Sequence, residues 1–201
     1  MENRRPIASR DSTWAHSIGA WLAAHHVRPN YISLASIAFG AFAGVAFWKL
    51  ADYGWISLLG AMVGMQLRLL ANLFDGIVAI EGGYRTPSGE VFNDAPDRAS
   101  DLLILVPAGY AAGWPELGWL AGVFAVLTAY ARVLGGSLGL KQEFIGPMAK
   151  QHRMAILTGA CVLAFFDRRA LVIALALIAL GSAITTGRRL VRIVRALERR
   201  G

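Results

Sequence analysis

Residues 71–101 read ANLFDGIVAIEGGYRTPSGEVFNDAPDRASD, and they lie between two stretches that are almost wholly apolar. The segment holds six acidic residues, which are Asp75, Glu81, Glu90, Asp94, Asp97 and Asp101. Acidic side chains at or inside a membrane are costly unless they are paired or bind an ion. The pattern therefore predicts that this segment binds a cation and that the flanking stretches form membrane helices.

The chain as a whole is too apolar for an ordinary soluble domain, since 56% of its 201 residues are hydrophobic and only 16% are charged. Charge-free runs occupy residues 29–48, 53–67, 102–115, 117–131, 154–166 and 170–187. A membrane-spanning helix needs roughly 20 mostly apolar residues. The second, third and fourth runs approach that length only when charged residues are admitted, namely Arg68, Asp75, Asp97, Asp101 and Arg132. The sequence thus predicts an all-α integral membrane bundle of six transmembrane helices with some charged groups facing its interior.

The basic residues predict an orientation. With six spans, both termini and the second and fourth loops share one side, which carries fifteen of the 20 Lys and Arg residues. The other side carries Lys49, Arg168 and Arg169. Because an excess of Lys and Arg marks the cytoplasmic side, the acidic segment and both termini are predicted to face the cytoplasm. The polar, basic residues 1–28 show no signal-peptide pattern, so an integral protein of the cytoplasmic (inner) membrane is expected.

One membrane domain is predicted over residues 1–201. Within residues 9–27, Trp14, Ile18 and Trp21 recur at helical spacing, which is typical of an amphipathic helix at the membrane interface. Residues 30–187 form the predicted six-helix core, and residues 188–201 form a basic cytoplasmic tail suited to an anionic membrane face. Because topology explains the basic residues, no nucleic-acid partner is expected.

Two glycine pairs, Gly40 with Gly44 and Gly60 with Gly64, have a spacing that lets helices approach closely. A contact inside the bundle or a contact between two copies would both use them. Cys161 is the only cysteine and lies in an apolar run, so a disulfide within one chain is excluded.

The acidic segment also carries the residue types of a metal site. Its oxygen-bearing side chains are Asn72 and Asp75 at the end of the second predicted helix and Asn93, Asp94, Asp97 and Asp101 at the start of the third. Residues three or four apart share a helix face, and the short glycine-containing loop brings the two helix ends together. Oxygen ligands without Cys or His suit a hard cation such as Mg²⁺, Mn²⁺ or Ca²⁺.

The same segment resembles the signature of the CDP-alcohol phosphotransferase family, written Asp-x2-Asp-Gly-x2-Ala-Arg-x8-Gly-x3-Asp-x3-Asp. Here it stands as Asn72-x2-Asp75-Gly76-x2-Ala79-Ile80-x8-Gly89-x3-Asn93-x3-Asp97, with every gap preserved over about 26 residues. The stretch RPNYISLAS (28–36) also resembles the family's usual entry to the first span. Because Asn replaces the first and third acidic residues and Ile80 replaces the Arg, the resemblance is to a variant subgroup of the family.

The resemblance implies a six-helix membrane enzyme, usually a homodimer, that transfers a substituted phosphate from a CDP-linked donor to an alcohol and releases CMP. It implies that Asp97 is the catalytic base and that the cofactor is a divalent cation, Mg²⁺ or Mn²⁺. The implied metal positions are Asn72, Asp75, Asn93 and Asp97, and Asp94 could restore the charge missing at position 93. The implied nucleotide-binding positions are Asn72, Gly76, Ala79 and Gly89, with Arg85 or Arg68 as a substitute for the missing Arg.

Three further basic residues, Arg132, Lys150 and Arg153, are candidates to bind the acceptor or a phosphate. Arg132 is a charge inside the fourth predicted helix and needs a partner there. Lys150 and Arg153 lie in a loop where the family often places basic residues, although flanking positive charge explains them equally well. His152 is the alternative candidate base.

The leading hypothesis is a metal-dependent, phospholipid-synthesising transferase that moves a phosphatidyl group from CDP-diacylglycerol to a small polar alcohol. The alternative is a catalytically silent relative that binds nucleotide or lipid, suggested by Asn72, Asn93 and Ile80. A divalent-cation transporter would use the same acidic residues but has no need for glycines at this spacing. Metal-dependent release of CMP separates the three hypotheses.

Overall fold

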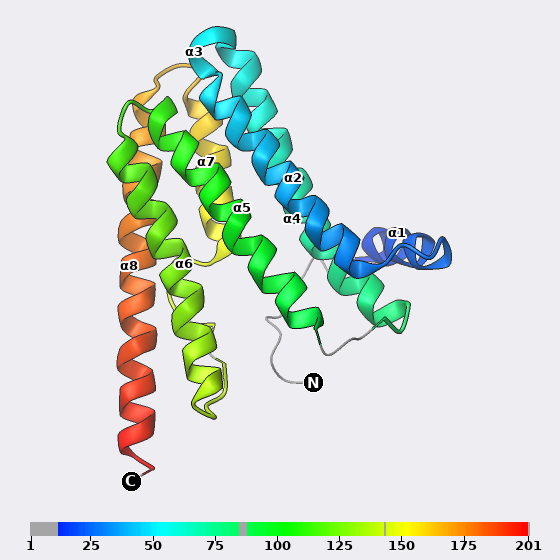
Figure 1. The fold of residues 1–201 in the computed structure, drawn as a ribbon. Coiled ribbons are helices and arrows are strands. Elements are labelled where there is room, and N and C mark those ends of the chain that lie inside the picture. Colours follow the sequence, from blue (N-terminus) through cyan, green and yellow to red (C-terminus); the bar gives the residue numbers. More distant parts are fainter. Residues whose placement is uncertain (1–11, 85–87, 143, 201) are drawn as a thin grey trace.

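The computed structural model describes residues 12–84, 88–142 and 144–200, and the secondary structure of these residues is helical, without strands. The helices are α1 (Thr13–Ala24), α2 (Pro29–Trp48), α3 (Leu50–Tyr53), α4 (Trp55–Glu81), α5 (Gly89–Ala111), α6 (Pro115–Ser137), α7 (Lys150–Leu163) and α8 (Arg169–Glu198). Figure 1 shows the long helices side by side as a bundle, from which α1 projects sideways. The predicted all-α class is confirmed.

Local chemistry sets several helix ends. Pro29 and Pro115 lie in the first turns of α2 and α6. Proline is tolerated there because the N–H groups of a first turn have no acceptor within the helix, so the N–H that proline lacks is not needed. Gly54 has φ 53°, a conformation that glycine adopts without strain, and it allows the chain to reverse between α3 and α4. The predicted bounds of the first span, 29–48, agree with those of α2.

Glycines let α2, α4 and α5 approach one another closely. A Cβ added at Gly44 would lie 2.0 Å from the carbonyl oxygen of Leu103 in α5. A Cβ at Gly64 of α4 would lie 2.9 Å from the backbone nitrogen of Ala43 in α2. The two glycine pairs expected to mediate helix contacts therefore lie at contacts within one chain, and the pair in α2 meets α5 where the acidic segment ends.

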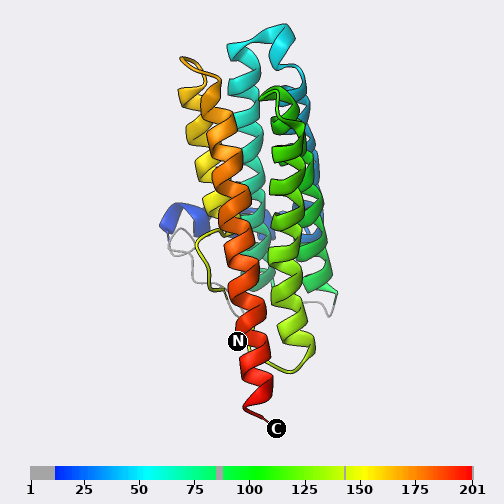
Figure 2. The ribbon, with the colours of Figure 1, turned by 90° about the vertical axis from the view of Figure 1, so that its left-hand side faces the viewer.

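The second half of the bundle packs α5 against α6, α6 against α8, and α7 between α4 and α8. Its core is made of buried aliphatic and sulfur-containing side chains, among them Leu105, Met154, Leu157, Leu175 and Ile178. Cys161 is also buried there. Figure 2 shows α8 running along the bundle and past its lower end.

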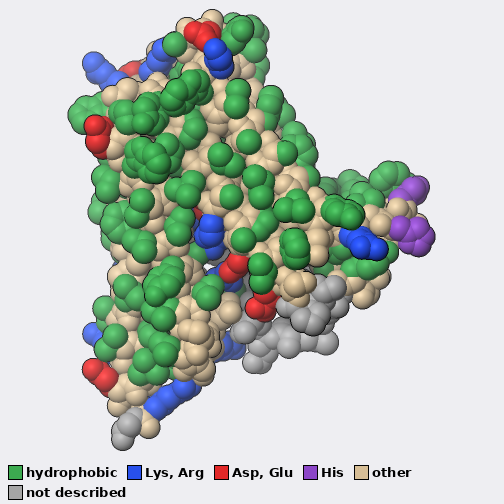
Figure 3. All heavy atoms as spheres, viewed as in Figure 1, with side chains coloured by type: hydrophobic (Ala, Val, Ile, Leu, Met, Phe, Trp, Pro, Cys, Tyr) green, Lys and Arg blue, Asp and Glu red, His purple; other side chains and the backbone are tan. Residues whose placement is uncertain are grey.

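Four helices in the described part of the chain are long and apolar enough to cross a membrane: α2, α4, α6 and α8. Helix α5 is charged in its first half, and α7 has only 14 residues, so α5 is not apolar enough and α7 is not long enough to be counted with these four. Hydrophobic side chains are distributed over the whole height of the flank seen in Figure 3, and charged side chains are few on its upper half. A membrane location is thus supported by four helices, whereas the six-span prediction is not confirmed and stays a prediction.

The end of α4, the start of α5, the end of α6 and the end of α8 all lie toward the bottom of Figure 1. These are the parts that the charge pattern assigns to the cytoplasm, an orientation that stays a prediction. Within the range predicted for the interfacial helix, α1 is present and packs on α4 through Ala15, Leu73 and Ile77; its place at the membrane interface stays a prediction, and residues 9–11 lie outside the described residues. Helix α8 runs without a break to Glu198, so most of the basic tail continues the last apolar helix.

Candidate active site

The acidic segment comes together where α4 and α5 meet. Asp75 of α4 is 4% exposed, and its Oδ2 accepts a hydrogen bond from the hydroxyl of Ser33 in α2 at 2.7 Å. Asp97 of α5 and Lys150 of α7 lie close enough to Asp75 to interact with it electrostatically. Four helices therefore contribute polar groups to one site inside an otherwise apolar bundle.

Asp97, the candidate base, is surrounded by cations. Lys150 Nζ donates to both of its carboxylate oxygens, at 2.9 and 2.7 Å. Arg68 Nη2 lies 3.6 Å from Asp97 Oδ1, and Arg98 Nη2 lies 3.6 Å from Oδ2. The Asp97 charge is thus compensated within the chain, and Lys150 fixes the direction of its carboxylate.

Asp101, one helical turn further along α5, forms a buried network with two arginines. Arg68 of α4 donates to Asp101 Oδ1 at 2.8 Å, and Arg153 of α7 donates to Oδ2 at 2.7 Å. All three side chains are almost inaccessible to solvent. The network ties three helices together one turn of α5 beyond the candidate base, farther from the start of that helix, and it gives Arg153 a partner other than a substrate.

Asp94 is held by Arg132 of α6, whose Nη2 lies 2.6 Å from each carboxylate oxygen. The same guanidinium donates to Gln142 Oε1 at 3.3 Å, and it lies 5.6 Å from the centre of the Phe144 ring. The pair is partly exposed, with 17% of the Arg132 side chain and 36% of Asp94 accessible. Arg132 thus has the partner that a charge in an apolar helix requires.

The donor chemistry fits a hard cation on the α4 side. Asn72 Oδ1 and Asp75 Oδ1 are both buried and have no hydrogen-bond partner, so two oxygens are left for a ligand. On the α5 side, Asp94 and Asp97 are engaged by Arg132 and Lys150. Consistent with this, among residues 12–84, 88–142 and 144–200 no three acidic, His or Cys side chains lie close enough together to hold a metal ion. A site with several carboxylate ligands therefore needs at least one of these ion pairs to open.

The remaining candidate positions lie at the adjoining ends of α4 and α5. Gly76 is buried and Ala79 half-buried in α4, whereas Gly89 begins α5 and Asn93 is half-buried in its first turns. Arg85 lies outside the described residues. The nucleotide-binding and metal-binding roles of these residues stay predictions.

His152, the alternative base, is exposed. Its Nδ1 lies 2.8 Å from the carbonyl oxygen of Pro147, a residue of the segment that precedes α7. Lys150, by contrast, directs its side chain to Asp97 from the same turn of α7.

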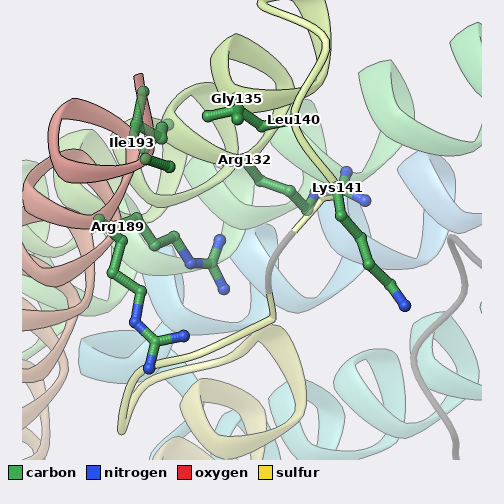
Figure 4. A pocket seen from close by; sticks show the side chains of 9 residues that line it. Arg132, Gly135, Leu140, Lys141, Arg189 and Ile193 are labelled. Carbon is green, nitrogen blue, oxygen red and sulfur yellow. The ribbon is translucent and has the colours of Figure 1, made fainter. Parts of the chain in front are cut away.

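A cavity of about 210 Å³ lies beside Arg132, between α6, the segment after it and α8. Its lining consists of Ala131, Arg132, Gly135, Leu140, Lys141, Arg189, Arg192, Ile193 and Ala196. Figure 4 shows the basic side chains that reach this region from the three elements. The cavity adjoins the Asp94 end of the site, because Arg132 takes part in both.

Two buried polar residues of this region, Ser33 and Arg189, were not predicted from the sequence. Ser33 lies within RPNYISLAS, but no pattern in that stretch singles it out as the partner of Asp75. Arg189 is buried and donates to the carbonyl oxygens of Thr128 and Ile145, unlike the exposed arginines around it. The available signal was the polar series Ser182, Thr185, Thr186 and Arg189, which shares one face of α8.

A scan against models of protein families finds no match to the chain. The sequence is similar to those of two curated proteins. The Escherichia coli inner membrane protein YnbA is 29% identical over 140 residues, which are 68% of this chain and 67% of YnbA. An uncharacterized protein of Aquifex aeolicus is 30% identical over 183 residues, which are 87% of this chain and 86% of that protein.

Solved structures with a similar fold include Mycobacterium tuberculosis phosphatidylinositol phosphate synthase, PgsA1. The structure with CDP-DAG bound superposes with a TM-score of 0.78 at 18% identity, covering 90% of this chain and 94% of that one. The structure in complex with manganese and citrate gives a TM-score of 0.77 at 18% identity, covering 89% and 88% of the two chains. PgsA1 is a CDP-alcohol phosphotransferase, and at this identity the likeness establishes the fold.

Proposed function

The chain belongs to the same protein family as the A. aeolicus protein, and from this membership and the PgsA1-like fold we propose that it is a CDP-alcohol phosphatidyltransferase. In the proposed reaction a phosphatidyl group passes from CDP-diacylglycerol to a small polar alcohol, and CMP is released. The donor is proposed because PgsA1, with the same fold, binds CDP-DAG. The variant subgroup with Asn at motif positions 72 and 93 is part of the proposal.

One observation carries it: the motif residues Asp75 and Asp97, 22 positions apart in the sequence, face the same polar site with Lys150. A protein that only needed to bury six membrane helices would gain nothing from such charges, which are costly to bury. Clustered ionisable groups inside a membrane protein are the usual mark of a functional site.

Asp97 is the proposed base. It accepts the proton of the acceptor hydroxyl while that oxygen attacks the phosphorus carrying the diacylglycerol. The bond between this phosphorus and the bridging diphosphate oxygen breaks, and CMP leaves with the electron pair. Lys150, which now holds both Asp97 oxygens, orients the carboxylate until the acceptor arrives.

Asn72 and Asp75, with Asp94 and Asp97 once their ion pairs open, are the residues that would hold Mg²⁺ or Mn²⁺; Asn93 is included on the motif alone. Such an ion, when bound, would neutralise the negative charge of the diphosphate. The PgsA1 complex with manganese supports a divalent cation in this fold. We also propose the cytoplasm-facing site, the homodimer and the six spans that the sequence predicts.

The test is release of CMP by the purified full-length chain in lipid nanodiscs, supplied with CDP-diacylglycerol, Mn²⁺ and a panel of polyols and their phosphates. Asp97→Asn should lower turnover by about 10²-fold or more, the usual contribution of a general base, while donor binding persists. Asp52→Asn is the matched control, since Asp52 is exposed and pairs with the equally exposed Lys49. Unchanged turnover in Asp97→Asn would remove it as the base.

The second candidate is the silent relative, favoured by the two Asn residues and by the engagement of Asp94 and Asp97 with basic side chains. It predicts donor binding without CMP release for every acceptor. Activity that appears only after Asn72→Asp with Asn93→Asp would establish this alternative.

A further inference from the structure

Arg98 follows the candidate base in the sequence, and its guanidinium is only loosely engaged. Its Nη2 lies 3.6 Å from Asp97 Oδ2, which is beyond hydrogen-bond distance. Its Nε is buried and has no hydrogen-bond partner in the part of the chain that the structure describes. A buried N–H without an acceptor is costly, and in native proteins such a group usually finds one. The acceptor for Arg98 is therefore to be sought in a ligand.

Access distinguishes Arg98 from the other basic residues around the base. Each of those holds a carboxylate at hydrogen-bond distance, and they are Arg68, Arg132, Lys150 and Arg153. Arg68 and Arg153 also have unpaired N–H groups, but their side chains are only 0% and 3% exposed, so a ligand does not reach them. The Arg98 side chain is 23% exposed. It thus combines an unpaired donor with a path to it from outside.

The charges around the base favour an anion as that ligand. Among the described residues, the contacts of the site join five cationic side chains to four carboxylates, and the carboxylates are Asp75, Asp94, Asp97 and Asp101. Arg98 is the cation left over after the hydrogen-bonded pairs are formed. It stands four residues after Asp94 and three before Asp101, so it shares a face of α5 with both. An anion bound there would balance the surplus charge.

We propose that Arg98 binds the phosphate that is transferred, donating to oxygens of the phosphorus that carries the diacylglycerol. The inference rests on the proposed function, in which Asp97 takes the proton of the hydroxyl that attacks this phosphorus. A guanidinium 3.6 Å from the Asp97 carboxylate is then a neighbour of the phosphoryl oxygens. Its planar fork suits two oxygens of one phosphate, and its charge stabilises the negative charge that they carry during transfer.

Arg98 also answers a question that the motif leaves open. Ile80 stands where the family signature has Arg, so a guanidinium is missing from the end of α4. Of the two substitutes expected from the sequence, Arg68 is enclosed and holds Asp101, and Arg85 lies outside the described residues. Arg98 supplies a guanidinium from α5 instead.

The test compares the binding of CDP and of CMP to the full chain in phosphatidylcholine nanodiscs, by calorimetry at one fixed Mg²⁺ concentration. The second phosphate of CDP stands in for the transferred one, and CMP lacks it. Arg98→Gln should weaken CDP binding at least about tenfold, the scale of a charged hydrogen bond, and leave CMP binding unchanged. Arg98→Lys keeps the charge but not the planar fork, so it should recover only part of the loss. Arg188→Gln is the matched control, because Arg188 is exposed on α8 and its loss removes the same charge.

Unchanged CDP affinity in Arg98→Gln overturns the contact. Equal weakening of CDP and CMP overturns it too, because damage to the structure affects both nucleotides alike. Wild-type CDP affinity in Arg98→Lys would reduce Arg98 to a general counter-charge of Asp97, against the proposal. Failure of the proposed function gives a different result: a wild type that binds CDP through Arg98 but releases no CMP with any acceptor loses the transferase and keeps the contact. A wild type that binds neither nucleotide overturns both.

Discussion

Replacing Asp101 by Asn removes the charge that balances two buried arginines. The Asp101 carboxylate accepts from Arg68 at 2.8 Å and from Arg153 at 2.7 Å, and the exposed fractions of the three side chains are 0%, 0% and 3%. Removing one partner of a buried ion pair costs about 3–5 kcal/mol, because the remaining charge is left uncompensated. Since Asn keeps the shape and one acceptor oxygen, we expect the free energy of unfolding to fall by about 3 kcal/mol.

The measurement is unfolding in mixed micelles by titration with sodium dodecyl sulfate, followed by tryptophan fluorescence. Asp52→Asn is the matched control: its pair with Lys49 is equally short, at 2.9 Å, but both side chains are about half exposed, so a loss below about 1 kcal/mol is expected. Adding Arg153→Met to Asp101→Asn should recover part of the loss, because it removes an uncompensated buried charge. Equal losses in the two single variants would refute the idea that the buried network holds α4, α5 and α7 together.

Three further results are expected. Asp75→Asn should weaken Mn²⁺ binding by at least about tenfold, a loss seen even for outer partners of metal ligands, and unchanged affinity in paramagnetic resonance would place the metal elsewhere. Gly44→Ala should lower the free energy of unfolding by about 1–3 kcal/mol in the same detergent titration, because the new Cβ would lie 2.0 Å from a backbone oxygen of α5. Gly159→Ala is the control: Gly159 has open space around it, so this substitution should be neutral or stabilising. Equal effects of the two substitutions would contradict the close packing at Gly44. On a cysteine-free background, a cysteine at Arg199 should react only with reagent on the cytoplasmic side and one at Asp52 only from the opposite side, and the reverse pattern would overturn the orientation.

Helix positions were largely readable from the sequence, because hydrophobic runs and prolines act locally. The run 29–48 agrees with α2, and the proline at each of positions 29 and 115 begins a helix. The acidic segment was also identifiable as the polar part of the molecule, and Asp75 and Asp97 do share a site. These features depend on spacing along one or two helices, which periodicity encodes.

The partners of the charges were not readable, since they depend on how helices distant in the sequence are placed. Arg132 and Lys150 were candidates for substrate binding, yet they pair with Asp94 and Asp97, 38 and 53 positions away. No single sequence distinguishes a basic residue that awaits a phosphate from one that neutralises a carboxylate. Burial of Arg189 among exposed arginines is likewise a property of the contact between α6 and α8.

The unbroken course of α8 has a mechanical consequence. At 1.5 Å per residue its 30 residues extend about 45 Å, whereas the hydrocarbon layer of a bilayer is about 30 Å thick. One stiff rod therefore joins the lipid-embedded core to Arg189 and Arg192 at the cavity. Helices respond to a thinner bilayer by tilting, so lipid chain length would move these two guanidinium groups relative to Arg132 on α6. Acyl-chain length is thereby a physical variable that sets the spacing of the charged groups around this cavity.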